Sequence, residues 1–254
     1  MTEDLGGGLK AIAAGQFQLN GDRAGSLTKE DSSVTVTGGF GSVAISNTRS
    51  GDTAIAANVF ASWMPVTSWY DTVAPLRSNI DLLSYTSPAI SGFTVGLSIT
   101  ELTQGATTSA NKVNTISGTY SNGPLTIMAA LKNTTGAVAA TVKRSNTEFA
   151  ATYDFGVAKI GFGSDGAITT GASAYSDSSA MSYGISVPVG AVTVGMNGAK
   201  RGVNKFVEGG VNYALSKRST LALMYGDMTN SSNSSVTYAS KAGAQYRVGL
   251  KHTF

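Results

Sequence analysis

The sequence predicts an all-β fold, an antiparallel transmembrane β-barrel, from three observations. Apolar and polar residues alternate with a period of two from end to end of the chain, which is typical of strands with two different faces. Only 13% of the residues are charged, about half the share of a soluble domain. Short turns alternate with longer connections, as in membrane barrels, where turns are short on one side and loops long on the other.

The last strand, within 242–254, shows the alternation most clearly. One face carries Ala244, Tyr246, Val248, Leu250, His252 and Phe254, and the other carries Gly243, Gln245, Arg247, Gly249, Lys251 and Thr253. The same pattern recurs at 93–100, 125–132, 192–197 and 220–226. The polar faces hold mainly Gly, Ser, Thr, Asn and Gln, whereas a solvated outer surface usually carries many more charges. We therefore expect the apolar face outside and the polar face toward a lumen.

The connections between these strands fall into two classes. Short turns are expected at 6–8, 38–41, 88–92, 122–124, 155–157, 188–191 and 215–219. Longer connections are expected at 21–31, 50–78, 102–112, 133–146, 164–179, 199–205 and 228–241. The strict alternation of the two classes predicts turns on the periplasmic side and loops outside.

This division gives fourteen full strands from residue 9 onward and a short strand at 1–5. The short strand and the last strand would run in the same direction, so an all-antiparallel barrel cannot close between them. Either the short strand is left out of a fourteen-strand barrel, or one and a half further strands precede it and the complete protein has sixteen strands. We expect the second, because TEDLG at 2–6 already resembles the end of a strand. Aromatic residues near many strand ends form a candidate girdle: Phe17, Tyr85, Phe93, Tyr120, Phe149, Tyr153, Phe155, Phe162, Tyr183, Tyr213, Tyr225 and Tyr246.

Several other classes of protein fit the composition poorly. There is no Cys and one His, so a zinc or disulfide site is not expected, and the sequence implies no cofactor. Basic residues never run beyond a pair, so nucleic acid is not an expected partner. We expect no enzyme, because His252 lies on the predicted lipid-facing side and no serine is evidently paired with it.

Five segments, in order along the chain, resemble betaproteobacterial general porins of the Gram-negative outer membrane: TEDLGGGLKA at 2–11, GGFGSVAIS at 38–46, SYTSPAISGF at 84–93, NYALSKRSTLALMYG at 212–226 and VGLKHTF at 248–254. The resemblance implies one sixteen-strand barrel domain over 1–254, assembled as a homotrimer. It implies a passive diffusion channel for small hydrophilic solutes and ions. It also implies contact with the lipid bilayer and lipopolysaccharide, and recognition of Phe254 by the barrel-assembly machinery.

In that family the third extracellular loop folds into the lumen and forms the constriction. By position this loop is 50–78, which contains Phe60, Tyr70 and both Trp residues, Trp63 and Trp69. Two family arginines are absent: Asn47 stands directly after the fifth strand of the family, followed by Arg49, and Ser84 precedes Tyr85. With these two arginines absent from the cluster that the family has on the pore wall, strong anion selectivity is not expected.

The charged residues of the loop and of the polar faces are the candidates for selectivity, because the charges in the narrow part of a pore set its ion preference. We expect Asp71 to face Arg49, Arg77 or Lys10 across the constriction, with Asp52, Asn47 and Ser84 nearby. The lumen-facing charges expected along the strands are Lys132, Glu148, Asp154 and Arg247, with Lys159 and Lys251 nearer the periplasmic rim.

Two other functions remain open at this point. A structural or adhesive barrel with a plugged lumen would need bulky inward side chains, and the predicted polar face is mostly small. A channel for more apolar solutes would need an apolar lumen. The aromatic residues of 60–70 are consistent with this alternative.

Replacement of Asp71 by Asn tests the predicted constriction. Removing a carboxylate from the narrow part of a pore should shift the cation-to-anion permeability ratio toward anions. Reversal potentials in planar bilayers under a salt gradient measure this ratio. An unchanged reversal potential would place Asp71 away from the constriction.

Overall fold

The structure, a computed structural model, describes residues 1–19, 27–49, 56–60, 79–101, 112–135, 144–166, 179–229 and 243–253. Fifteen strands in this part of the chain form one sheet in which the order of strands follows the sequence. Every strand pairing that the structure details is antiparallel. The all-β antiparallel prediction is confirmed, as is the count of fourteen full strands after a short first one.

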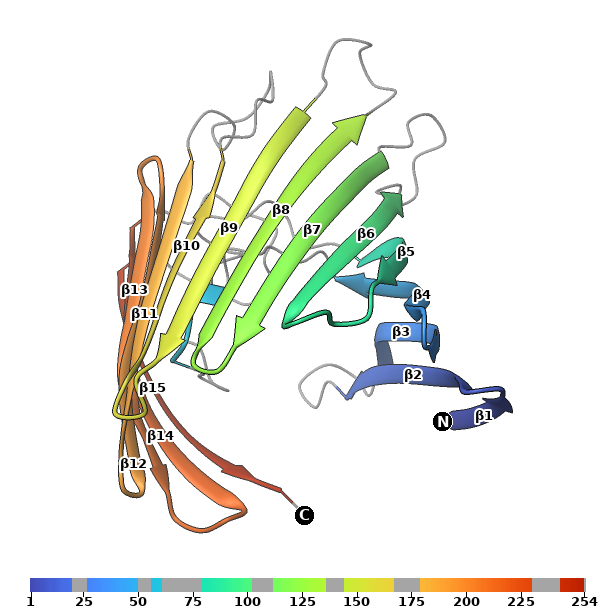
Figure 1. The fold of residues 1–254 in the computed structure, drawn as a ribbon. Helices are drawn as coiled ribbons and strands as arrows, with labels where there is room; N and C mark the ends of the chain where they lie inside the picture. Colours follow the sequence, from blue (N-terminus) through green and yellow to red (C-terminus); the bar gives the residue numbers. More distant parts are fainter. Residues whose placement is uncertain are drawn as a thin grey trace. The chain divides into compact units, whose positions relative to one another are not determined.

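Two compact units make up the chain. The first contains β1–β6 and most of β7, the second contains residues 56–60, most of β9 and all of β10–β15, and β8 contributes to both. Figure 1 shows successive strands side by side in chain order within each unit, blue to green in the first and yellow to red in the second. The prediction of a single domain stays a prediction.

The strands have the following bounds. In the first half they are β1 (Thr2–Gly6), β2 (Leu9–Leu19), β3 (Leu27–Gly38), β4 (Gly41–Arg49), β5 (Asn79–Thr86), β6 (Phe93–Glu101), β7 (Lys112–Asn122) and β8 (Leu125–Thr135). In the second half they are β9 (Arg144–Asp154), β10 (Lys159–Asp165), β11 (Ala180–Val189), β12 (Val192–Arg201), β13 (Asn204–Ala214), β14 (Ser219–Thr229) and β15 (Gly243–His252).

The two faces of the strands differ in burial in the way that the alternation predicts. On β11, for example, Met181, Tyr183 and Ile185 are exposed, whereas Ser182 and Gly184 between them are buried. Large apolar side chains are likewise exposed on β4, β6 and β15, and Ile45 reaches 69%. A soluble sheet would bury these residues, so the apolar face is the one that meets lipid.

The tight turns form where glycine supplies a backbone conformation that other residues rarely adopt. Gly6, Gly7 and Gly8 between β1 and β2 all have positive φ, as does Gly123 between β7 and β8. All seven predicted short turns separate consecutive strands. The hairpins are therefore encoded locally, by residues that favour reversal of the chain.

One predicted long connection is wrong. The segment 199–205 is a two-residue turn, because β12 continues to Arg201 and β13 begins at Asn204, and these two residues pair directly. Gly202 makes the reversal possible with a φ of 58°. The strict alternation of short and long connections therefore fails between β12 and β13.

Several residues of the predicted aromatic girdle are exposed on the apolar face. Tyr85, Phe93 and Tyr120 belong to the short-turn ends of β5–β7, and the Tyr85 hydroxyl donates a hydrogen bond to the Phe40 carbonyl, 2.8 Å away. On the second unit, Tyr225 and Tyr246 are cross-strand partners with ring centroids 5.1 Å apart. Aromatic side chains of this kind are typical of the membrane interface. The described part of the chain contains no helix long and apolar enough to cross a bilayer.

Arginine at two adjacent positions of β4 tests the assignment of the faces. Ile45 is on the exposed apolar face, and Ser46 is on the opposite face. Ile45→Arg should lower the free energy of unfolding in lipid vesicles by about 2–4 kcal/mol, because it places a charge in hydrocarbon. Ser46→Arg should change it much less, and equal losses in denaturant titrations would contradict the assignment.

Candidate functional site

A short segment of the predicted inward-folding loop lies on the polar face of the second unit. Residues 56–60 begin with a single helical turn at Ala56 and Ala57. Both Ala57 and Phe60 are buried, and they contact positions on β10, β11 and β12. The described part of the loop therefore rests on the wall, as an inward fold requires.

Asn197 of β12 holds this segment through its side-chain amide. Its Nδ2 donates a hydrogen bond to the Phe60 carbonyl at 2.8 Å, and its Oδ1 accepts one from the Phe60 N–H at 3.1 Å. The amide thus satisfies both backbone groups of one loop residue, as a neighbouring strand would. The Asn197 side chain is buried, with 2% of the residue exposed, so these hydrogen bonds are shielded from water.

Glycines on neighbouring strands make room for the segment. Gly161 of β10 pairs with Gly184 of β11, which in turn pairs with Asn197. A Cβ atom at Gly161 or Gly184 would lie less than 3.0 Å from the Ala57 carbonyl oxygen, and one at Gly195 would overlap the Phe60 ring. Any side chain at these three positions would displace the segment. Glycine is needed here for close backbone approach.

The Phe60 ring completes the contact. It is 1% exposed and packs with Met224 of β14, which is also buried. Burying a phenylalanine side chain contributes about 1.5–3 kcal/mol. The ring is therefore part of the attachment to the wall and does not line an open passage.

A row of polar residues crosses the same face nearer the loop ends of the strands. Successive cross-strand partners place Glu148, Asp165, Ala180, Arg201 and Asn204 side by side on β9–β13. Arg201 Nη2 donates to Asp165 Oδ2, and both side chains are almost fully buried. Glu148 and Asn204 are buried and have further partners of their own. Buried charges persist only with such partners.

Three charged residues of this face, as well as Asn197, are absent from the candidates that the sequence supplied. Asp165 and Arg201 fall inside segments predicted as connections, and Glu208 lies opposite Asn197, 3.4 Å from its Nδ2. Alternation could have identified Arg201, because it continues the face of Asn197 and Ala199 by steps of two. The two strands extend further than the polar composition of their ends suggests.

The other predicted lumen charges divide by position. Asp154 and Lys159 are opposite each other on β9 and β10, near the short turn, and both are exposed. Arg247 pairs with Met224, and Lys251 pairs with Thr220, so both belong to the polar face of β15. Lys132 of β8 follows the exposed Leu131 and is half-buried. These placements agree with the predicted polar face.

The candidates for the constriction are only partly described. Lys10 pairs with Thr37, and Ser84 pairs with Ala44 and Ser98, so both lie on the polar face of the first unit. Asn47 instead shares the face of Ile45, and its Nδ2 donates a hydrogen bond to Asp81 Oδ1 at 2.7 Å. Three loop residues, Asp52, Asp71 and Arg77, lie outside the described residues, as do Phe254 and the side chain of Arg49.

The expectation that no serine lies beside His252 is wrong, because Ser219 Oγ lies 2.9 Å from His252 Nδ1. The two residues are cross-strand partners at the start of β14 and the end of β15. Sequence reasoning missed the pair because their proximity depends on the register of two strands. Both belong to the apolar face, and no group of three metal-ligating residues occurs within the described ranges.

Comparisons with known proteins agree with this architecture. Residues 1–233 match the Gram-negative porin family. Outer membrane porin protein 32 of Delftia acidovorans is 30% identical over 179 residues, which cover 63% of this chain and 50% of that protein. The chain thus spans about half the length of this curated relative.

Solved structures show the same fold. An anion-selective porin from Comamonas acidovorans superposes with a TM-score of 0.69 at 26% identity, covering 100% of this chain and 87% of that one. A triple mutant of the Rhodopseudomonas blastica porin gives 0.68 at 15% identity, with coverage of 100% and 88%. The second likeness concerns the fold alone. The family match over 1–233 includes the four resembling segments between residues 2 and 226 and confirms the resemblance: the chain belongs to the Gram-negative porin family, whose members are outer-membrane β-strand proteins.

Proposed function

We propose that this protein is a passive diffusion channel for small hydrophilic solutes and ions across the outer membrane. The observation that carries the proposal is that residues 56–60 pack against the polar face of the sheet. A wall of small and polar side chains with a loop fixed against it is the arrangement that narrows a water-filled barrel without closing it. The exposed apolar face supplies the complementary surface for lipid.

The proposal extends to the remainder of loop 50–78 as the constriction. Asp52, Asp71 and Arg77 belong to the same loop, and we assign the charges at the narrowest point to them, with Lys10 and Ser84 on the wall. Arg49 pairs with Asn79 and continues the face of Asn47, so we leave it out of the wall. Fixing Phe60 limits where the rest of the loop can reach. Phe60 itself is buried against Met224, which weakens the alternative of a channel for apolar solutes.

Burial favours a modest preference for anions. On the polar face of the second unit, Glu148, Asp165 and Glu208 are buried, whereas Lys159, Arg247, Lys251 and the single acid Asp154 are exposed. Exposed charges act on a passing ion more strongly than buried charges do. The Comamonas acidovorans relative is named as anion-selective, which supports the same sign here.

Family membership supports three further proposals about partners. We propose a homotrimer, contact with lipopolysaccharide and the lipid bilayer, and reading of Phe254 by the barrel-assembly machinery. No catalytic role is proposed, because the Ser219–His252 pair lies on the apolar face.

Replacing Asn197 by Ala tests the attachment of the loop. The change removes both hydrogen bonds to Phe60 and leaves two buried backbone groups without partners, which costs about 1–3 kcal/mol each. We expect a wider spread of single-channel conductance and faster fluctuation of the open current. Planar bilayer recordings measure both quantities.

Asn212→Ala is the matched control, because Asn212 is on the same face two rows away from Asn197. It should leave the conductance distribution unchanged. If Asn197→Ala behaves like Asn212→Ala, the 56–60 segment does not set the width of the pore.

Replacing Arg247 by Glu tests the sign of selectivity. Arg247 is exposed on the polar face, so reversing its charge should move the reversal potential toward cation preference in a salt gradient. Lys200→Glu is the control, because Lys200 is exposed on the opposite face, opposite Met181 and Lys205. Equal shifts for the two variants would show that overall charge, and not the lining, sets the preference.

A further inference from the structure

The attachment of residues 56–60 depends on the orientation of one side-chain amide. Asn197 Oδ1 accepts a hydrogen bond from the Phe60 N–H, and Asn197 Nδ2 donates one to the Phe60 carbonyl. If the amide were turned over, its oxygen would face the carbonyl and its NH2 group would face the N–H, so both hydrogen bonds would be lost. The contact with the loop therefore requires that one orientation of the amide be favoured over the other.

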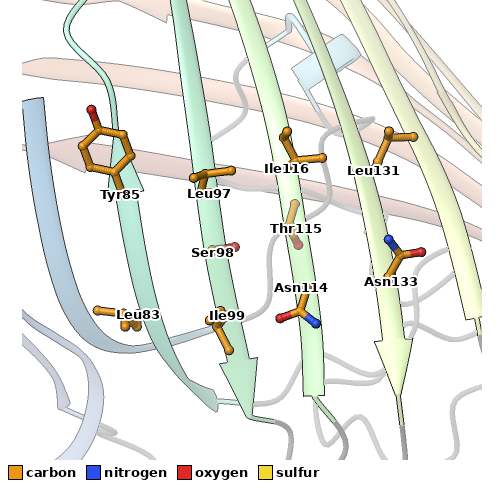
Figure 2. Close-up of a pocket in the computed structure, with 10 residues that line it drawn as sticks. All are labelled: Leu83, Tyr85, Leu97, Ser98, Ile99, Asn114, Thr115, Ile116, Leu131 and Asn133. Carbon is orange, nitrogen blue, oxygen red and sulfur yellow. The ribbon is translucent and has the colours of Figure 1, made fainter.

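The burial of Asn197 means that the protein itself has to favour this orientation. Asn114 and Asn133 provide a contrast in the groove across β5–β8 of the first unit, where Figure 2 shows them on neighbouring strands. Both of these residues are exposed, and an exposed amide can turn over without disturbing the groups around it. Asn197 is only 2% exposed, so its neighbours in the sheet determine which way its amide points.

Two cross-strand neighbours flank the Asn197 amide. Gly184 of β11 lies opposite Asn197 on one side, and Glu208 of β13 lies opposite it on the other. Asn197 Oδ1 lies on the Gly184 side, because a Cβ atom added to Gly184 would be 2.7 Å from this oxygen. Asn197 Nδ2 lies on the Glu208 side, 3.4 Å from Oε1. The oxygen of the amide thus points away from the carboxylate, and its NH2 group points toward it.

The carboxylate of Glu208 distinguishes the two orientations electrostatically. Glu208 is 5% exposed, so little water screens its interaction with the amide. Turning the amide over would bring Asn197 Oδ1 against Glu208 Oε1, and two acceptors would then face each other. In the observed orientation the same carboxylate accepts a hydrogen bond from Nδ2, and hydrogen bonds to an ionised acceptor are about twice as strong as neutral ones. On its other side Glu208 lies opposite Gly226 of β14, which contributes no side-chain donor.

We propose that Glu208 is the positioning residue of the loop attachment. Its carboxylate holds the Asn197 amide in the orientation that matches the N–H and the carbonyl of Phe60. Glu208 thus acts on the loop through Asn197. Where the inference concerns the width of the pore, it rests on the proposed function, because that function assigns the width to the segment that Asn197 holds.

Exchanging the chemical groups of the two side chains tests the proposal. Glu208 also has interactions besides the one with Asn197, so simple removal of its side chain would test more than this contact. The variants Asn197→Asp, Glu208→Gln and the double replacement keep the size of both side chains. The rate of hydrogen exchange at the Phe60 N–H is measured in each by nuclear magnetic resonance, on the refolded full-length protein in lipid nanodiscs.

The effect of Glu208→Gln should reverse its sign between the two backgrounds. Asn197→Asp should accelerate exchange at Phe60, because the Phe60 carbonyl loses its donor and two carboxylates face each other. In that background Glu208→Gln should slow exchange about tenfold, because the new amide donates to the new carboxylate and one hydrogen bond is recovered. With Asn197 intact, Glu208→Gln should instead accelerate exchange slightly. An equal effect in both backgrounds would show that Glu208 acts independently of Asn197 and would overturn the proposal.

Glu148→Gln is the matched control. Glu148 is another buried glutamate of the polar face, 2% exposed, and its row of paired residues reaches β12 at Arg201 and not at Asn197. The rate of exchange at Phe60 should be unaffected by this replacement in either background. If Glu148→Gln reproduces the effects of Glu208→Gln, the total charge of the wall holds the loop, and the contact between Glu208 and Asn197 does not.

Single-channel recordings of the same variants separate this inference from the proposed function. If Asn197→Asp widens the spread of conductance and the double replacement narrows it again, both are supported. If the exchange rates follow the prediction while the spread of conductance stays constant, Glu208 does position Asn197, but the 56–60 segment does not set the width of the pore. In that case the proposed function fails and the positioning role of Glu208 stands.

Discussion

Pairing of the backbone in a non-aqueous surrounding is the constraint on which the rest of this structure depends. A strand in hydrocarbon has no water to satisfy its N–H and C=O groups, so each must find a partner in a neighbouring strand. Continuous antiparallel ladders meet that requirement for the described strands, in chain order. Once the ladders are fixed, side chains alternate between the two faces, apart from register shifts between Asp4 and Gly6 and between Gly15 and Phe17. Apolar residues on one face then leave small and polar residues on the other.

The small residues of the polar face have a consequence beyond polarity. Gly161, Gly184 and Gly195 leave a depression in the sheet where another backbone can approach. Asn197 then supplies the hydrogen bonds that a missing strand would supply, and Phe60 contributes the buried apolar area. The loop segment therefore follows the same rule as the strands. Where its backbone meets the wall, its N–H and C=O groups form hydrogen bonds with a side chain of the wall.

Charge on the polar face is graded by burial. Asp165 and Arg201 are paired and buried near the loop ends, whereas Lys159 and Lys251 are exposed toward the short turns and Arg247 is exposed in the middle of β15. The sequence alone does not distinguish the buried charged residues from the exposed ones, because both follow the same alternation of polar and apolar positions. The register of neighbouring strands places Asp165 and Arg201 in the same row, where they form an ion pair. The pairing of β4 with β5 places Asn47 on the apolar face. The alternation of side chains predicts the same face, because Val43, Ile45 and Asn47 are two residues apart.

The sequence by itself determined the strands, their faces and most turns, because side-chain alternation and glycine-rich reversals are local properties. It also identified the family through short motifs spread along the chain. Only the tertiary structure decided that Asn197 binds Phe60, a residue 137 positions away, and that Ser219 meets His252. These contacts depend on register and on the folding back of a loop. No local sequence pattern predicts these contacts, because each residue could pair with many other residues of the chain.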